Sequence, residues 1–138
     1  MEEQNLKGNS EQELTQKFMM FEQQIRFVQE QLQAVEQAIV DINTLNMDLD
    51  ELNGSVDKEV FASIGKGIYA KAKLISEELI VDVGGKNFVK KSIPETKRLL
   101  EEQSKKLESI KEDLNAEAEK INEDLTRVFM ESQGKSKE

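Results

Sequence analysis

The 138-residue sequence contains no cysteine, no histidine and no tryptophan, and only one proline. Without cysteine there is no disulfide framework and no thiolate site. Without histidine as well, most zinc sites and the usual proton shuttle are excluded, so we expect no metal and no cofactor. No apolar run approaches the roughly 18 residues that a membrane-spanning helix needs, and nothing resembles a signal peptide. We therefore expect a soluble, cytoplasmic protein with no membrane partner.

Charge is abundant and unevenly distributed. Charged residues make up 34% of the sequence and hydrophobic residues only 37%, a balance that favours elongated helices over a thick core. Residues 58–98 hold nine Lys and Arg against five Asp and Glu, within a chain whose net charge is −9. The remaining segments are therefore strongly acidic, which argues against a clamp that neutralises phosphates. We predict no nucleic-acid partner.

The first long segment has the spacing of a coiled-coil helix. Residues 1–9 show no periodicity and are expected to form a flexible tail. Ser10 and Glu13 then fit a capping box, which predicts a helix over residues 10–53. Its seam recurs in steps of four and three at Leu14, Phe18, Phe21, Ile25, Val28, Leu32, Val35, Ile39 and Ile42, then slips to Leu45, Leu49 and Leu52.

A second helix is predicted over residues 92–131, followed by a flexible tail at 132–138. Ser92 and Glu95 form another capping box, and the single proline fits its first turn. The seam reads Ile93, Leu100, Leu107, Ile110 and Leu114, then after a stutter Ala118, Ile121, Leu125 and Val128, with polar interruptions at Thr96 and Gln103. The two arms are nearly equal in length, so we predict one chain folded back as an antiparallel coiled coil.

The middle segment, residues 54–91, changes from a period of 3.5 to a period of 2. Its alternating apolar runs, separated by glycine-containing turns, predict four short strands in two β-hairpins and hence an α+β fold. Two isolated hairpins bury little surface and leave their strand edges open. Other subunits must therefore complete the sheets, and we predict that this segment is an assembly module.

No pattern in the sequence predicts catalysis. The two glycine–lysine turns are not phosphate-binding loops, because Ile68 and Asn87 follow the lysines where Ser or Thr would be needed, and strands come next. Paired carboxylates such as Glu101 and Glu102 lie on predicted helix faces with no cleft around them. No nucleophile and base can be brought together, so we predict that the protein is not an enzyme.

An excess of apolar residues marks one end of the predicted coiled coil. In the sequence KFMMF, Phe18 and Phe21 keep the seam register, but Met19 and Met20 do not. Phe129 and Met130 stand beside the seam on the opposite arm in the same way. Antiparallel pairing brings both excesses to the end that is far from the strands. One interpretation is a widened seam; the other, which we favour, is a soft apolar surface that adapts to varied partners.

The order helix, two hairpins, helix resembles that of the prefoldin α-class subunit. The resemblance depends on ASIGKGIYAKAKLISEELIVDVGGKNFVKKSIPETKRLL, residues 62–100, and the paired arms extend it to a single domain over residues 1–138. It implies an ATP-independent chaperone without a cofactor. Two α-class and four β-class subunits would form a hexamer, whose coiled-coil tips hold unfolded polypeptides and pass them to a group II chaperonin.

The resemblance also implies a role for individual residues. By position, the client-binding tip comprises Leu14, Phe18, Met19, Met20, Phe21, Leu125, Val128, Phe129 and Met130. The assembly surface comprises Val60, Ala62, Ile64, Ile68, Tyr69, Ala70, Leu79, Val81, Val83, Phe88 and Val89. The alternative is a structural, self-assembling protein related to prefoldin, whose hairpins polymerise into filaments.

Overall fold

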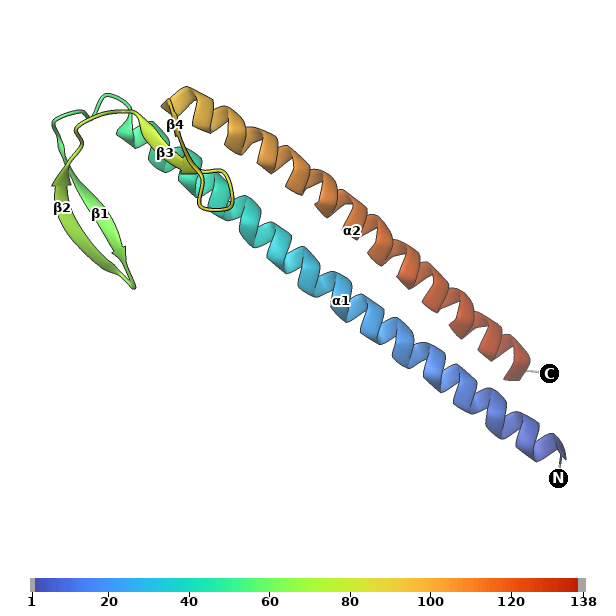
Figure 1. The fold of residues 1–138 in the computed structure, drawn as a ribbon. Coiled ribbons are helices and arrows are strands. Elements are labelled where there is room, and N and C mark those ends of the chain that lie inside the picture. Colours follow the sequence, from blue (N-terminus) through green and yellow to red (C-terminus); the bar gives the residue numbers. More distant parts are fainter. Residues whose placement is uncertain (1, 137–138) are drawn as a thin grey trace. The chain divides into compact units, whose positions relative to one another are not determined.

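The computed structural model describes the backbone of residues 2–136 and the side-chain environments of residues 11–133. It consists of two long helices with short strands between them (Figure 1). In chain order the elements are α1 (Glu2–Leu52), β1 (Glu59–Gly65), β2 (Ile68–Lys73), β3 (Leu79–Asp82), β4 (Phe88–Lys91) and α2 (Ile93–Ser136). The predicted α+β fold, with two β-hairpins between two helices, is confirmed. In the described part of the chain, no helix is long and apolar enough to cross a membrane.

The predicted start of the first helix at Ser10 is wrong, because α1 begins at Glu2. Residues 2–9, which we expected to form a tail, are helical, and Ser10 lies inside the helix instead of capping it. Most of these residues are good helix formers, and an existing helix gains a hydrogen bond with each residue added. That gain offsets the roughly 1 kcal/mol that Gly8 costs within a helix.

At the other end, α2 continues to Ser136 and not only to the predicted residue 131. The expected C-terminal tail is therefore helical over most of its length. Met1 and residues 137–138, which complete the two expected tails, lie outside the described residues.

The predicted start of the second helix is confirmed by its cap. The backbone N–H of Glu95 donates to Ser92 Oγ at 3.2 Å, so Ser92 satisfies one of the free amides of the first turn. Thr96, which interrupts the apolar seam, is buried, and its hydroxyl donates to the backbone oxygen of Ser92 at 2.9 Å. The polar group of Thr96 is thereby satisfied within the same turn.

Each hairpin forms a two-stranded antiparallel sheet of its own, β1 with β2 and β3 with β4. The turn between β1 and β2 places Gly65, Lys66 and Gly67 at positive φ, and the register shifts between Ser63 and Gly65. Such a turn suits glycine, which has no Cβ to clash in this region of φ. Both glycine–lysine turns connect strands, as the sequence predicted, and neither opens a helix.

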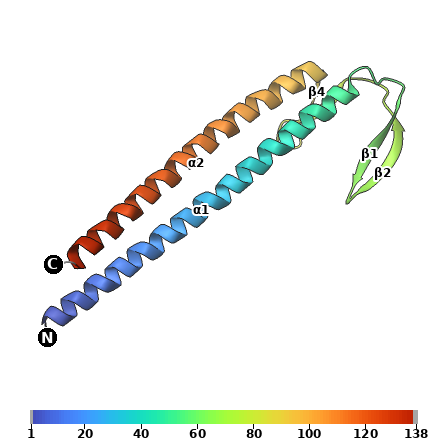
Figure 2. The same ribbon diagram turned by 180° about the vertical axis from the view of Figure 1, so that it is seen from behind.

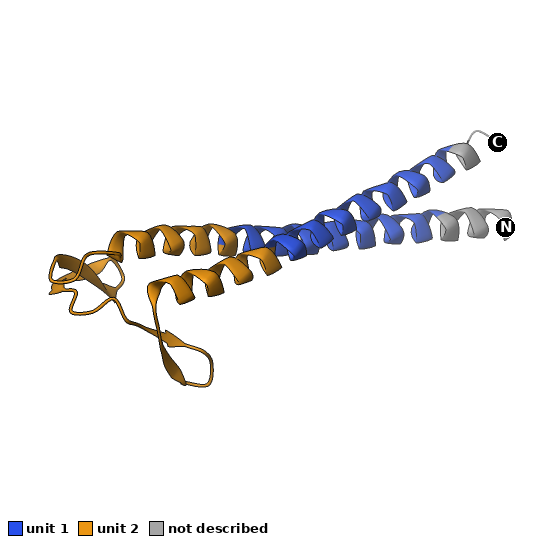
Figure 3. Ribbon diagram, turned by 90° about the horizontal axis from the view of Figure 1, so that it is seen from above, with its two compact units in different colours: residues 1–37, 108–138 blue, residues 38–107 orange. Residues whose placement is uncertain are grey.

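The contacts divide the chain into two compact units, each with its own core (Figure 3). Unit 1 comprises residues 1–37 and 108–138, and unit 2 comprises residues 38–107. The buried residues of unit 1 are Val28, Leu114 and Ile121, with Phe21, Ile25, Leu32, Val35 and Ala118 packed around them. In unit 2 the buried residues are Leu49, Ile93 and Leu100, with Ile42, Leu52 and Leu79 around them. In both units the helices are thus joined by the predicted seam.

The predicted slip of the seam after Ile42 is wrong. Leu45 is 44% exposed, whereas its neighbour Asn46 is partly buried. Steps of four and three therefore continue through Asn46 to Leu49, because the regular heptad on either side outweighs the polarity of one side chain. As a consequence, Asn46 Oδ1 is buried and has no hydrogen-bond partner among the described residues.

A similar correction applies to α2. Ile110 was predicted in the seam but is 46% exposed, and Lys111 is partly buried in its place. Steps of four and three then pass from Lys111 through Leu114 to Ala118 without the predicted stutter. A lysine is tolerated there because its aliphatic stem covers apolar surface while its amine reaches outward. The amine lies 3.9 Å from Glu36 Oε1 on the facing helix.

Candidate functional site

One end of unit 1 brings together the two segments that stood out in the sequence. The helices run antiparallel there, so residues 14–21 of α1 and residues 125–130 of α2 lie at the same end (Figures 1 and 2). The shared core around Val28 joins the two helices there, and Lys111 Nζ lies 3.9 Å from Glu36 Oε1 across them. The predicted meeting of the two apolar excesses is therefore present.

The predicted tip residues divide into two groups. The partly buried group faces the seam and comprises Leu14, Phe18, Phe21, Leu125 and Val128. The exposed group comprises Met19, Met20, Phe129 and Met130, which are between 50% and 67% exposed. These four residues are called the tip surface below. Their placement agrees with the expectation that Phe18 and Phe21 join the helices while the methionines point outward.

The tip surface is apolar, flexible and supported by a complete core. Methionine has three rotatable bonds and a polarisable sulfur, so its side chain adapts to differently shaped partners. The one cation of the adjacent turns of α2, Arg127, is paired with an acid, since its Nη2 lies 3.5 Å from Asp124 Oδ1. Exposed apolar groups of this kind favour binding of other apolar groups. The binding role of these residues stays a prediction.

The hairpin of β1 and β2 has two chemically different faces, which the strand register defines. On one face Val60 pairs with Ala72 and Ala62 with Ala70, so this face is small, apolar and uncharged. We call these four residues the alanine face. On the opposite face, the pairs are Glu59 with Lys73, Phe61 with Lys71 and Ser63 with Tyr69. The predicted assembly residue Tyr69 therefore lies on the other face from Val60, Ala62 and Ala70.

This hairpin has no core of its own. Phe61, Ile64, Ile68 and Tyr69 are all exposed, although each is a large side chain on a short strand or at its end. A two-stranded hairpin is marginally stable in water unless something packs on it. The alanine face and the free strand edges are the surfaces on which another chain would complete it.

The second hairpin, β3 with β4, packs partly against the helices of its own chain. Leu79, predicted in the assembly surface, packs against the buried cluster of Leu49, Ile93 and Leu100 in unit 2. Leu79 thus anchors β3 to the helices of unit 2, and its place in the assembly surface stays a prediction. Val83, Phe88 and Val89, also predicted, are exposed, and Val81 is partly buried opposite Val89.

One known protein family has a sequence model that matches this chain. The family model of prefoldin subunits matches residues 21–138. The chain belongs to the prefoldin family. Prefoldins are a chaperone-type family and not a family of enzymes.

A solved prefoldin has a similar fold. The chain is similar to a filamentous prefoldin from Methanocaldococcus jannaschii, with a TM-score of 0.75 and 16% sequence identity. The match covers 85% of this chain and 98% of that one. At this identity the similarity supports the fold alone. Comparison with curated proteins gives no significant match.

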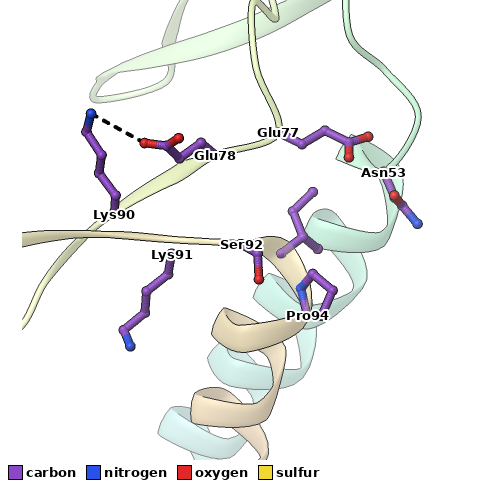
Figure 4. Close-up of a pocket in the computed structure, with 8 residues that line it drawn as sticks. Asn53, Glu77, Glu78, Lys90, Lys91, Ser92 and Pro94 are labelled. Carbon is purple, nitrogen blue, oxygen red and sulfur yellow. Dashed lines mark ion pairs between the residues drawn. The ribbon is translucent and has the colours of Figure 1, made fainter.

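A polar pocket lies beside the start of α2 in unit 2 of this prefoldin chain (Figure 4). Lys90 Nζ lies 3.5 Å from Glu78 Oε1, and a carboxylate oxygen of Glu77 accepts the backbone N–H of Gly54. Both partners of the ion pair are largely exposed, so water screens their charges. Among the described residues, no group of three or more His, Cys, Asp or Glu could hold a metal ion. Three of the charged groups that line the pocket, those of Glu77, Glu78 and Lys90, thus already have partners in the chain.

Several exposed apolar residues of this prefoldin chain were not predicted as site residues. They are Phe61 and Ile80 on the strands, Ile75 between the two hairpins, and Phe27 on α1. Phe27 is easily overlooked in the sequence because it directly precedes Val28, a residue of the buried seam. Its signal in the sequence is a spacing of seven residues from Met20.

Proposed function

We propose that this chain is an α-class prefoldin subunit, an ATP-independent holdase that binds unfolded polypeptides in the cytoplasm. The observation that carries the proposal is the tip surface, where four apolar side chains, three of them flexible methionines, stay exposed beside a complete helical core. The assignment to the α class is supported by the two hairpins, since the β class carries only one.

Binding at such a surface requires no chemical step. Apolar segments of a non-native chain pack on Met19, Met20, Phe129 and Met130, and the methionines adjust to each client. One pair of helices buries too little surface for tight binding, so the affinity comes from several subunits acting on one client. The retained client then passes to a group II chaperonin.

The multivalency comes from assembly through the hairpins. Two copies of this chain and four β-class subunits form the hexamer, and their strands cover the alanine face and the open edges of β1 and β2. This assignment is supported by the chemistry of the hairpin, because only one of its two faces is free of charge.

A second candidate is self-assembly into a filament. It is favoured by the solved prefoldin of similar fold, which is itself filamentous. In that case strands of identical chains pair with one another, and each added chain leaves a new open edge.

Two measurements test the proposal. Native mass spectrometry of the chain alone, and with a β-class prefoldin, distinguishes a closed hexamer that needs the partner from open polymers of the chain alone. Light scattering of a chemically denatured model protein then measures the suppression of aggregation without ATP. A hexamer that fails to suppress aggregation contradicts the holdase function.

A further inference from the structure

Phe27 is 59% exposed on a helix whose other large aromatic residues face the seam. Its neighbour Val28 is almost completely buried in the core of unit 1. Successive residues of a helix point about 100° apart. The buried Val28 therefore fixes Phe27 on the outer side of α1, where it contributes nothing to the pairing of the helices.

Phe27 lies directly in line with the tip surface. It follows Met20 by one heptad, and Met20 is 58% exposed. Residues seven apart on a helix lie within about 20° of the same face and about 10 Å apart along the axis. Met20 and Phe27 therefore form one outward strip, which we call the outer strip. It begins at the tip surface and runs along α1 away from the helix start.

The rim of the outer strip is rich in side-chain amides. The positions three and four residues from Phe27 are Gln23, Gln24, Glu30 and Gln31, and all four are exposed. Three of these four side chains both donate and accept hydrogen bonds without carrying charge. The fourth, Glu30, carries a negative charge, so the rim is mostly but not wholly uncharged.

This chemistry matches one class of partner. A non-native polypeptide presents apolar side chains together with backbone N–H and C=O groups that lack intramolecular partners. Glutamine amides pair with such groups, while Phe27 and Met20 receive the apolar side chains. A packed helix of a second chain has its own backbone groups satisfied and gains nothing from the amides.

We propose that the client-binding surface continues from the tip surface along the outer strip as far as Phe27, and that its ligand is an extended segment of non-native polypeptide. About three residues of extended chain span the interval between Met20 and Phe27. The inference depends on the proposed holdase function and adds a second contact region, outside the seam, to each subunit.

The direct test is photo-crosslinking. The photoreactive analogue p-benzoylphenylalanine replaces Phe27 in the full chain, assembled with its partner subunits and mixed with a denatured model protein. The same analogue at Met47, an α1 residue that is 69% exposed, serves as the matched control. We expect client crosslinks from position 27 and few from position 47. Crosslinks from position 27 to a second copy of the chain, or equal client yields at both positions, overturn the proposal.

The functional test uses F27Q, which keeps a good helix former and removes the apolar ring. We expect that about fivefold more of the variant is needed for half-maximal suppression of aggregation, because a partly buried aromatic contact is lost. The control M47Q is expected to match the unaltered chain, and circular dichroism checks that both variants fold. Equal activity of F27Q and the unaltered chain overturns the outer strip alone. If the unaltered chain itself does not suppress aggregation, the holdase function and this inference both fail.

Discussion

Both units of this chain expose large apolar side chains, but the two sets differ in what supports them. The tip surface and Phe27 stand on helices that already share a buried core around Val28 and Leu114. The hairpin of β1 and β2 has exposed side chains on both of its faces. Removing an exposed methionine from a completed core should change binding without changing the fold. Disturbing the alanine face should instead prevent the assembly on which that hairpin depends.

The largest expected effect is on assembly and distinguishes the two faces of β1. Ala62→Asp places a carboxylate on the alanine face, and Ser63→Asp places the same group on the opposite face. A buried charge without a partner costs about 3–5 kcal/mol, so A62D should abolish assembly. Native mass spectrometry with a β-class partner measures this.

Ser63→Asp is the matched control, because Ser63 is the next residue and pairs with Tyr69 on the face that carries Lys71 and Lys73. We expect S63D to assemble normally. If both variants assemble equally well, the alanine face is not the contact surface. If both fail, the register does not separate an inner from an outer face.

The next effect concerns the tip surface. Met19→Ser combined with Met20→Ser removes two flexible apolar contacts while leaving the core of unit 1 untouched. The loss should raise the amount of protein needed for half-maximal suppression of aggregation by about tenfold, with no change in native mass. A double variant with full holdase activity would show that the tip assignment is wrong.

The sequence predicted the fold well because both periods are long and regular. Four heptads from Leu14 to Ile42 outweigh any single exception, and alternation with glycine turns marks the strands. The predicted seam was wrong where an apolar residue stood next to the position that the heptad repeat requires. Leu45 and Ile110 are more apolar than Asn46 and Lys111, but the seam position depends on the packing of all the neighbouring turns.

The candidate surfaces were only partly predictable, for a related reason. Met19 and Met20 break a regular seam and are visible in the sequence, whereas Phe27 stands between polar residues and a buried valine and is recognised only once Val28 is placed. Likewise, Leu79 and Ile80 are similar in sequence terms. Only the structure shows that Leu79 packs on the helices of its own unit, whereas Ile80 is exposed.

Asn46 provides a smaller test of the corrected seam. Its Oδ1 atom is buried without a partner, beside a groove that includes Ile42, Leu100 and Ser104. Asn46→Leu removes this unsatisfied group and adds apolar contact, so it should raise the free energy of unfolding by about 1–2 kcal/mol. The exposed Thr44→Leu, outside that groove, serves as the control and should change it little. Equal stabilities of N46L and the unaltered chain in chemical denaturation would place Asn46 outside the seam.

The smallest effect is expected at the ion pair of unit 1. Glu36 and Lys111 are 3.9 Å apart, and their side chains are 55% and 36% exposed. Water and salt screen such a pair, so Glu36→Gln should lower the free energy of unfolding by no more than about 0.5 kcal/mol. The loss should disappear at high salt, where the pair is already screened. A larger loss that persists at high salt would mean that Glu36 stabilises unit 1 by packing.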